Sequence, residues 1–237
     1  MKTKRIVIVG CAHSGSRAAD INEFKRYVDL AEEPDTYLLI LGDLFENAIP
    51  SRGEGMMFEQ SLTPDDQIDE VDRILRPVKD KIIGACTSNH SRRTYKEVGI
   101  DMDAQLYKRL GIHKVYQGLQ GVVLFEGKQI AFAHGMGSGD NWNDAKRLFA
   151  VYPQADIVAV SHRHEMTSKW FGSYRIKGRA RRERHDALFV RTGGLMAWAP
   201  YAQAELYSPQ KPGFSMVLID PDGTIRVDTN GLPRKKV

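Results

Sequence analysis

Cysteine is scarce in this sequence, and long apolar runs are missing. Its 237 residues include two cysteines, Cys11 and Cys86, and no stretch approaches the roughly 18 to 20 apolar residues that a membrane-spanning helix needs. The opening residues MKTKRIVIVGCAH contain too short an apolar stretch for a signal peptide. We therefore expect a cytoplasmic protein that makes no use of a membrane and has no structural disulfide.

Internal repeats and low-complexity segments are also missing. Hydrophobic residues make up 42% and charged residues 27% of the chain, close to globular averages, which argues against disorder and against fibrous proteins. A chain of this length fits one well-buried core. We therefore expect a single domain over residues 1–237, and the sequence leaves the oligomeric state open.

Short β-branched runs alternate with amphipathic stretches through most of the chain. The predicted strands are 4–10, 36–41, 81–86 and 156–160, and the predicted helices are 21–31, 63–76, 101–110 and 141–152. A hairpin is expected within 115–134, and the remainder is predicted to be β-structure, with strands at 187–190, 216–219 and 224–227. This order, βα units first and hairpins later, predicts an α/β fold with mixed sheets flanked by helices.

Polar side chains of metal-ligand type follow the strand-like runs. They are Cys11, His13, Asp43, Asn89, His90, His134, His162 and His164. Groups beyond the carboxyl ends of neighbouring strands converge in an α/β sheet. Each element alone is weak, since Gly-Asp is usually a turn, but the His-x-His pair is more specific because alternate residues of an extended chain face one side.

In order and spacing this set resembles the calcineurin-like metallophosphoesterase superfamily. Its pattern is Asp-x-His, Gly-Asp, Gly-Asn-His-Asp/Glu, His and Gly-His-x-His, and the similarity covers residues 5–164. The resemblance implies a four-layer αββα sandwich of two mixed β-sheets flanked by helices, with two divalent metal ions. It assigns Cys11, His13, Asp43 and His164 to one ion, and Asp43, Asn89, His134 and His162 to the other.

The implied chemistry is hydrolysis of a phosphoester by metal-activated hydroxide. Imidazoles and an anionic bridge favour Mn, Fe, Zn or Ni over Mg, and Mn is our first choice. Asp43 and His90 are the predicted catalytic residues, since the resemblance implies that His90 contacts the substrate. Arg92, Arg93 and Arg191 are expected to bind its phosphate.

Two short segments narrow the predicted substrate. Residues 42–47 and 162–165 are similar to the double-strand-break repair nuclease of the superfamily, so we expect a phosphodiester in DNA, RNA or a nucleotide. The basic run 175–184 either follows a phosphate backbone or forms the solvated edge of a hairpin. We expect this run, a long loop or lid at 46–62 and the segment 136–142 to line the substrate entrance.

Departures from the pattern keep alternatives open. Cys11 stands where the superfamily has Asp, either as a thiolate that favours softer metals or as a packing residue beside a weakly held ion. Ser88 and Ser161 replace glycines, and Ser91 replaces an acid. The alternatives are a phosphomonoesterase of the same fold and a non-catalytic protein that binds metal or nucleic acid. A third is a cysteine-dependent phosphatase, because Cys11 and Arg17 have Cys-x5-Arg spacing.

Overall fold

The strands of the protein form two five-stranded sheets. The computed structural model describes residues 2–50, 56–136, 142–177, 181–198, 203, 204, 206, 208, 209 and 211–230. The strands are β1 Lys4–Val9, β2 Thr36–Ile40, β3 Ile82–Ala85, β4 Gln120–Phe125, β5 Lys128–Ala133, β6 Ile157–Val160, β7 Thr167–Lys177, β8 Arg181–Arg191, β9 Ser215–Ile219 and β10 Ile225–Asp228. The α-helices are α1 Ile21–Asp29, α2 Pro64–Leu75, α3 Ser91–Val98, α4 Met102–Arg109 and α5 Asn143–Val151.

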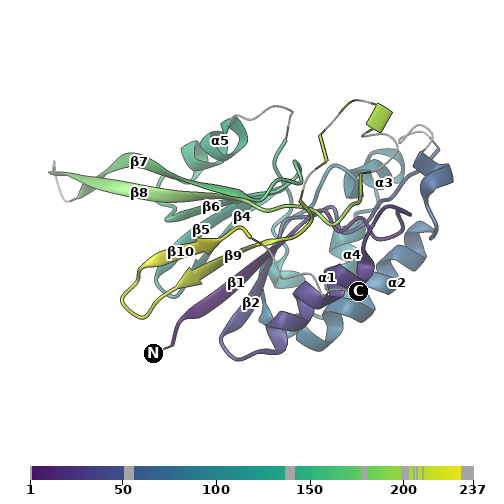
Figure 1. Cartoon of the computed structure of the whole chain (residues 1–237), viewed down its shortest axis with the longest axis horizontal. Coiled ribbons are helices and arrows are strands. Elements are labelled where there is room, and N and C mark those ends of the chain that lie inside the picture. Colours follow the sequence, from purple (N-terminus) through teal and green to yellow (C-terminus); the bar gives the residue numbers. More distant parts are fainter. Residues whose placement is uncertain are drawn as a thin grey trace.

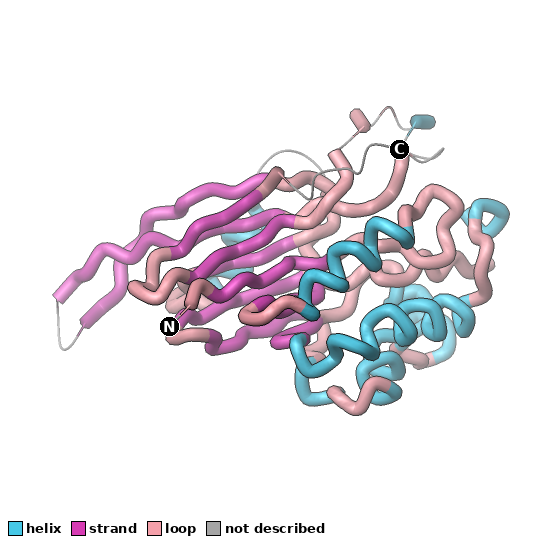
Figure 2. The backbone as a smooth tube through the Cα atoms, turned by 60° about the horizontal axis from the view of Figure 1, so that its bottom comes forward, coloured by secondary structure: helices cyan, strands magenta, loops and turns pink. Residues whose placement is uncertain are grey.

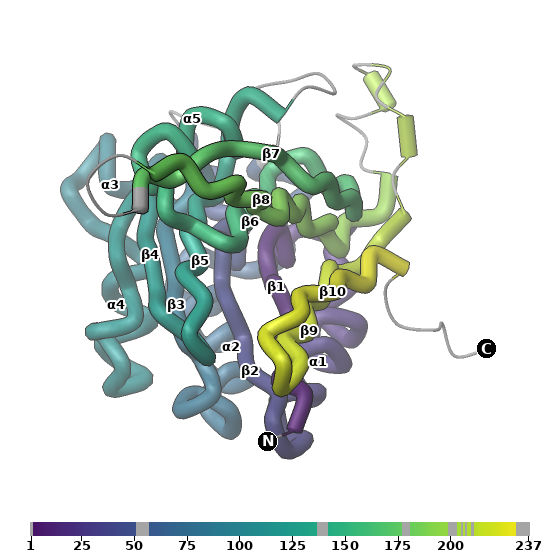
Figure 3. The backbone as a smooth tube through the Cα atoms, turned by 90° about the vertical axis from the view of Figure 1, so that its left-hand side faces the viewer, coloured from purple at the N-terminus to yellow at the C-terminus, as the bar shows by residue number. Residues whose placement is uncertain are grey.

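Both sheets are mixed. The first has the order β10-β9-β1-β2-β3, in which β1, β2 and β3 are parallel and β9 is antiparallel to β1. The second has the order β4-β5-β6-β8-β7, in which β5, β6 and β8 are parallel and both outer strands are antiparallel to their neighbours. Figure 3 views the molecule from one end and shows the two sheets stacked one above the other.

Alternating side chains of the strands build the layers. Ile6 and Ile8 of β1 pack between the sheets, together with Phe132 of β5, whereas Val7 and Val9 face the helices. Helices α1, α2 and α4 cover the first sheet, and Figure 2 shows these cyan helices beside the magenta strands. Helix α5 covers the second sheet. The predicted αββα sandwich of two mixed sheets is confirmed.

Two predicted local features hold and one helix was not predicted. The Thr63 side chain accepts a hydrogen bond from Asp66 N–H and caps α2. Glu126 and Gly127 both have positive φ in the turn between β4 and β5. Helix α3 has no counterpart among the predicted elements.

The described part of segment 46–62 is a loop, as predicted, with one 3-10 helix at Met56–Glu59. Its start does not act as a lid, because Glu46, Asn47 and Ala48 are buried. Residues 51–55 of this loop, 137–141 of the predicted entrance segment 136–142 and the basic tail 234–236 lie outside the described residues. No helix in the described part of the chain is long and apolar enough to cross a membrane.

The hairpin of β7 and β8 carries the basic run away from the ligand loops. Thr167 pairs with Arg191 at the base of the hairpin, and Lys177 pairs with Arg181 toward its tip. The loop with His162 follows β6, whose last residue pairs with Arg191 at the base. Ten steps of strand separate base from tip by roughly 33 Å, and Figure 1 shows the hairpin projecting beyond the other strands. The prediction that 175–184 lines the substrate entrance is therefore wrong; residues 178–180 lie outside the described part.

Candidate metal centre

The predicted ligands follow the carboxyl ends of five strands in two sheets. Cys11 and His13 follow β1, Asp43 follows β2, Asn89 and His90 follow β3, His134 follows β5, and His162 and His164 follow β6. The two sheets meet here, since His134 Nδ1–H donates to Leu41 O at 2.7 Å. Ser161 N–H in turn donates to His134 O at 2.9 Å. Segments far apart in the chain thus reach one place.

Unusual backbone conformations mark the same positions. Positive φ angles occur at Cys11 (55°), His13 (51°), Asp43 (48°), His162 (74°) and His164 (55°). Such values are uncommon for residues with a Cβ and persist where surrounding contacts enforce them, often at functional sites. Cys11 N–H donates to Gly42 O and His13 N–H to Asp43 O, both at 3.0 Å. These bonds lock the loops after β1 and β2 side by side.

Cys11, His13 and His164 form what we name the first ligand group. Their Sγ and ring nitrogen atoms lie within 4.8 Å of one another, and His13 Nε2 is 3.3 Å from His164 Nε2. His13 Nδ1–H donates to Glu46 Oε2 at 3.0 Å. This bond fixes the orientation of the ring and directs Nε2 toward Cys11 and His164.

Asp43, His134 and His162 form the second ligand group. His134 Nε2 lies 3.0 Å from Asp43 Oδ2 and 3.1 Å from His162 Nδ1. His134 donates its Nδ1 proton to Leu41 O, so in the neutral ring Nε2 carries a lone pair, and this lone pair faces a carboxylate oxygen of Asp43. Two atoms with lone pairs repel each other unless a proton or a cation lies between them. The donor set therefore fits a metal ion.

Asp43 stands between the two groups. Its Oδ2 is 3.0 Å from His134 Nε2 and 3.9 Å from His13 Nε2, and its Oδ1 accepts from His90 N–H at 3.3 Å. Asp43 therefore offers one carboxylate oxygen to ring nitrogens of both groups. This position suits the bridging role that the sequence resemblance implies.

The shifted pKa values show that positive charge stabilises the buried cluster. Burial tends to lower the pKa of His13, but its contacts with Cys11 and Glu46 outweigh burial and raise it to about 10. Burial likewise opposes the charge on His134, yet Asp43 raises its pKa to about 9. Against the effect of burial, the charge of His134 holds the pKa of Asp43 well below its usual range. Protons thus occupy positions that suit metal cations.

His90, Arg93 and Glu46 lie beside the first ligand group. His90 Nδ1–H donates to Glu46 O at 2.8 Å, and Arg93 Nη2 donates to His90 Nε2 at 3.1 Å. Burial lowers the pKa of His90 to about 4, with the charge of His13 acting in the same direction. His90 is therefore neutral at neutral pH, and the Arg93 guanidinium is the positive group next to it.

The other predicted site residues lie in different surroundings. Asn89 is exposed in the loop after β3 and precedes His90 in the sequence. The Arg92 guanidinium lies 5.8 Å from the ring centre of Tyr95. Arg191 is 1% exposed and pairs with Asp144 (3.4 Å) and Glu165 (3.0 Å). Its guanidinium is held in the interior rather than presented to a substrate.

Three buried polar residues outside the predicted set support the site. Glu46 orients His13, and Asn47 Nδ2 donates to His90 O at 2.7 Å. Ser161 Oγ lies 3.1 Å from Cys11 Sγ. The sequence signal for Glu46 and Asn47 was their place in the nuclease-like segment 42–47, and no local pattern links Glu46 to His13, which lies 33 residues away.

The geometry gives no support to a cysteine-dependent phosphatase. Such an enzyme needs free backbone N–H groups around the thiolate to bind phosphate. Here the backbone N–H groups of residues 11, 13, 14, 16 and 17 already donate to carbonyl oxygens of the protein. The thiol of Cys11 is fully buried and Arg17 is exposed, so the Cys-x5-Arg spacing does not build a phosphate loop.

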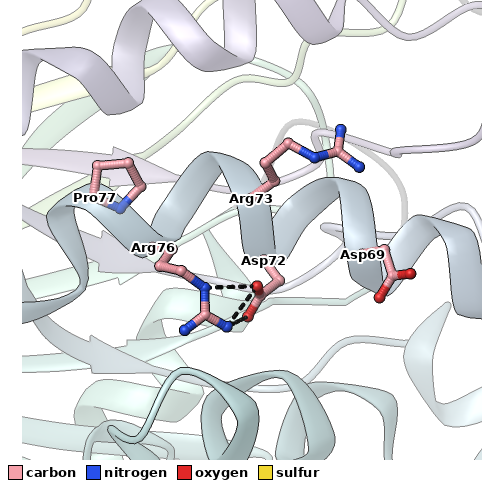
Figure 4. A pocket seen from close by; sticks show the side chains of 5 residues that line it. All are labelled: Asp69, Asp72, Arg73, Arg76 and Pro77. Carbon is pink, nitrogen blue, oxygen red and sulfur yellow. Dashed lines mark hydrogen bonds and ion pairs between the residues drawn. The ribbon is translucent and has the colours of Figure 1, made fainter.

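A surface hollow lies along α2, away from the ligand groups. It is lined by Asp69, Asp72, Arg73, Arg76 and Pro77 (Figure 4). Arg76 donates to both carboxylate oxygens of Asp72, at 2.7 and 2.6 Å, and Asp69 pairs with Arg109 at 2.7 Å. These acids have partners already, and we assign the hollow no role.

Comparison with known proteins supports the fold. No protein-family model and no curated protein matches the chain. An archaeal phosphodiesterase matches in structure with a TM-score of 0.52 and 13% identity, over 94% of this chain and 98% of that one. The phosphoesterase YfcE from E. coli matches with a TM-score of 0.47 and 17% identity, over 95% and 98%. Vps29 of Chaetomium thermophilum gives 0.47 and 17%, over 95% and 93%. The chain thus shares its fold with the archaeal phosphodiesterase, and this fold is the αββα sandwich that was predicted.

Proposed function

We propose that this protein is a metallophosphoesterase that hydrolyses a phosphodiester, with a nucleic acid or a nucleotide as substrate. The observation that carries the proposal is the convergence of the two ligand groups on Asp43, with ring nitrogens, a thiol and a carboxylate facing one another across the ends of both sheets. The similarity to an archaeal phosphodiesterase supports the choice of a diester.

The residues have separate roles in this proposal. The first and second ligand groups would each hold one divalent ion, with Asp43 shared between them and the exposed Asn89 amide added to the second group. When bound, such a pair of ions supplies a nucleophile at neutral pH by lowering the pKa of water, and neutralises charge on the phosphate. Arg93 binds the non-bridging phosphate oxygens and provides the positive charge, and His90, whose Nε2 accepts from Arg93, holds the guanidinium in place. Arg92, at the start of α3, assists them.

The substrate preference is tested with synthetic esters. Chelator-treated protein reconstituted with Mn²⁺ or Zn²⁺ is expected to hydrolyse bis-p-nitrophenyl phosphate faster than p-nitrophenyl phosphate, and single-stranded DNA or RNA is then tested. Chelation should abolish the activity, and Asp43→Asn should reduce kcat by about 100-fold or more, because both ions lose an anionic ligand.

Three results would change the proposal. Faster hydrolysis of the monoester would make the protein a phosphomonoesterase. Metal binding without turnover of either ester or of DNA and RNA, together with binding of nucleic acid unaffected by His90→Ala, would favour a non-catalytic binding protein. Activity that survives chelation would contradict the metal-dependent chemistry.

A further inference from the structure

We infer that Cys11 binds metal as a thiolate, that Ser161 hydrogen-bonds to it, and that the first ligand group therefore selects a thiophilic ion such as Zn²⁺ or Fe²⁺ over Mn²⁺ or Mg²⁺. This inference rests on the proposed function, because it specifies one half of the proposed metal centre. From the sequence we expected one type of metal at both positions. The inference instead gives two positions that prefer different metals.

The two cysteines of the chain provide an internal comparison. Both are fully buried. Cys86 packs in the apolar cluster between the sheets with Leu39 and Phe132, as a structural thiol does. Cys11 belongs to none of the three hydrophobic clusters that the described residues form. Its Sγ instead lies within 4.8 Å of the ligand atoms of His13 and His164.

The surroundings of Cys11 suit a ligand and not a packing group. Its Sγ is also within 4.8 Å of the ligand atoms of Asp43 and His134. With His13, His164 and Asp43 it completes a set of one sulfur, two nitrogens and one oxygen, the donor types and number that a tetrahedral zinc ion takes. Mn²⁺ and Mg²⁺ prefer oxygen donors, and in the proposed second group Asn89 would add one to that of Asp43.

Ser161 is placed to stabilise a thiolate. Its Oγ is 3.1 Å from Cys11 Sγ across 150 residues of sequence, and its side chain is buried. A thiolate only accepts, so the hydroxyl is then the donor. A Cβ at Gly10 would lie 2.4 Å from Ser161 Oγ, so the hydroxyl has its place because residue 10 is a glycine.

Cys11 and Ser161 are two positions at which the chain departs from the superfamily pattern, which has Asp and Gly there, and the structure puts the two departures in contact. Cys11 alone would only replace a carboxylate ligand by a thiolate ligand. Ser161 adds a buried hydroxyl that hydrogen-bonds to this ligand, and hydrogen bonds to metal ligands tune metal affinity.

Spectroscopy on the whole chain tests this without measuring activity. Chelator-treated wild-type protein is titrated with Co²⁺, which reports a bound thiolate through an intense near-ultraviolet charge-transfer band. We expect the band in the wild type and in the matched control Cys86→Ser, and we expect Cys11→Ser to bind Co²⁺ without it.

Metal competition provides the second readout. Cys11→Asp, which restores the residue of the superfamily, should raise the ratio of Mn²⁺ to Zn²⁺ affinity at the first ligand group by about tenfold or more, and Ser161→Gly should weaken Zn²⁺ binding by about tenfold. Circular dichroism checks that each variant is folded. The charge-transfer band of the wild type with Co²⁺ tests the inference even if a variant fails to fold.

The outcomes separate this inference from the proposed function. If the wild type binds Co²⁺ and hydrolyses phosphodiesters but shows no thiolate band, Cys11 is not a ligand and the inference fails alone. An unchanged metal preference in a folded Cys11→Asp protein would also overturn it. If the wild type binds no divalent ion, the proposed function fails with it.

Discussion

The carboxylate of Glu46 orients His13 from the side opposite the first ligand group. It is 2% exposed, and its Oε2 accepts the Nδ1 proton of His13 at 3.0 Å. Its Oε1 lies 3.8 Å from both His90 Nδ1 and Arg93 Nη1. One buried acid thus connects the metal side of the proposed centre with its substrate side.

Glu46→Gln should weaken metal binding or lower activity by about 10- to 100-fold, because an amide orients His13 less firmly than a carboxylate. Isothermal titration with Zn²⁺ and kcat with bis-p-nitrophenyl phosphate measure the two effects. Glu70→Gln is the matched control, since Glu70 accepts from a hydroxyl, Ser14 Oγ in the loop after β1 (2.6 Å), where Glu46 accepts from an imidazole. Equal behaviour of the two variants would remove Glu46 from the site.

Metal binding should release protons near neutral pH. The pKa values of His13 and His134 are raised to about 10 and about 9 in the metal-free protein, so both rings carry a proton that a metal must displace. Metal affinity should therefore rise with pH and level off once pH exceeds these values, where proton release disappears. Calorimetry in two buffers of different ionisation enthalpy at about pH 7 measures the release. Identical heats in both buffers would contradict the pKa directions.

Single residues differ in how far the sequence revealed them. Cys11, His13 and Asp43 were found because ligand types directly after strands are visible without coordinates. The burial of Arg191 could not be predicted, because it depends on ion pairs with Asp144 and Glu165, which come from other segments of the chain. A contact between positions as distant as Cys11 and Ser161 leaves no local pattern either.

Helix α3 positions His90 and was missed from the sequence for a physical reason. Within Ser91–Val98 the only buried residue is Ser91, so the segment has no apolar stripe of helical period. The helix ends at Gly99, which has φ 75°. The strands around the site were easier to predict, because β1, β2 and β6 are buried runs of branched apolar residues.

Asn47 attaches α3 to the loop after β2. Its Nδ2 donates to His90 O at 2.7 Å, and its Oδ1 accepts from Thr94 Oγ1 at 2.8 Å. Asn47→Ala should lower the free energy of unfolding by about 1–3 kcal/mol, because buried polar partners lose their bonds. It should also lower kcat while metal content is unchanged, because His90 is no longer held against the ligand groups.

The matched control for Asn47→Ala is Thr63→Ala, which removes the cap of α2 and should cost about 1 kcal/mol of unfolding free energy. Urea denaturation, metal analysis and kcat are measured on both. The control should lose stability without losing kcat. If Asn47→Ala lost stability alone in the same way, the link between α3 and the reaction would be wrong.

The ligand groups and the basic hairpin lie at opposite ends of the molecule. The ligand groups lie where β1, β2, β3, β5 and β6 end, and the tip of the β7–β8 hairpin lies at the opposite end (Figure 1). The sequence predicted the sheets but not this separation. The outer part of the hairpin, with Tyr174 71% and Ile176 77% exposed, has no core pattern that fixes its direction, and its basic residues suggested a substrate contact that the register excludes.

Neutralising this end should not affect catalysis on a small substrate. The triple change Arg181→Gln, Arg182→Gln and Arg184→Gln is expected to leave kcat/KM for bis-p-nitrophenyl phosphate within about twofold, since roughly 23 to 33 Å of strand separate these residues from the base of the hairpin. Steady-state kinetics with Arg93→Gln as the positive comparison measures this. A loss as large as that of Arg93→Gln would mean that the hairpin reaches the reaction site.

The convergence of both ligand groups on Asp43 is tested most directly by anomalous scattering from crystals soaked in Zn²⁺ and Mn²⁺. Two peaks are expected, one on each side of the Asp43 carboxylate, the first next to Cys11, His13 and His164 and the second next to His134 and His162. Their separation should be about 3.5–4 Å. Maps without a peak beside Asp43, from crystals whose protein is folded as described, would contradict the metal centre and with it the proposed function.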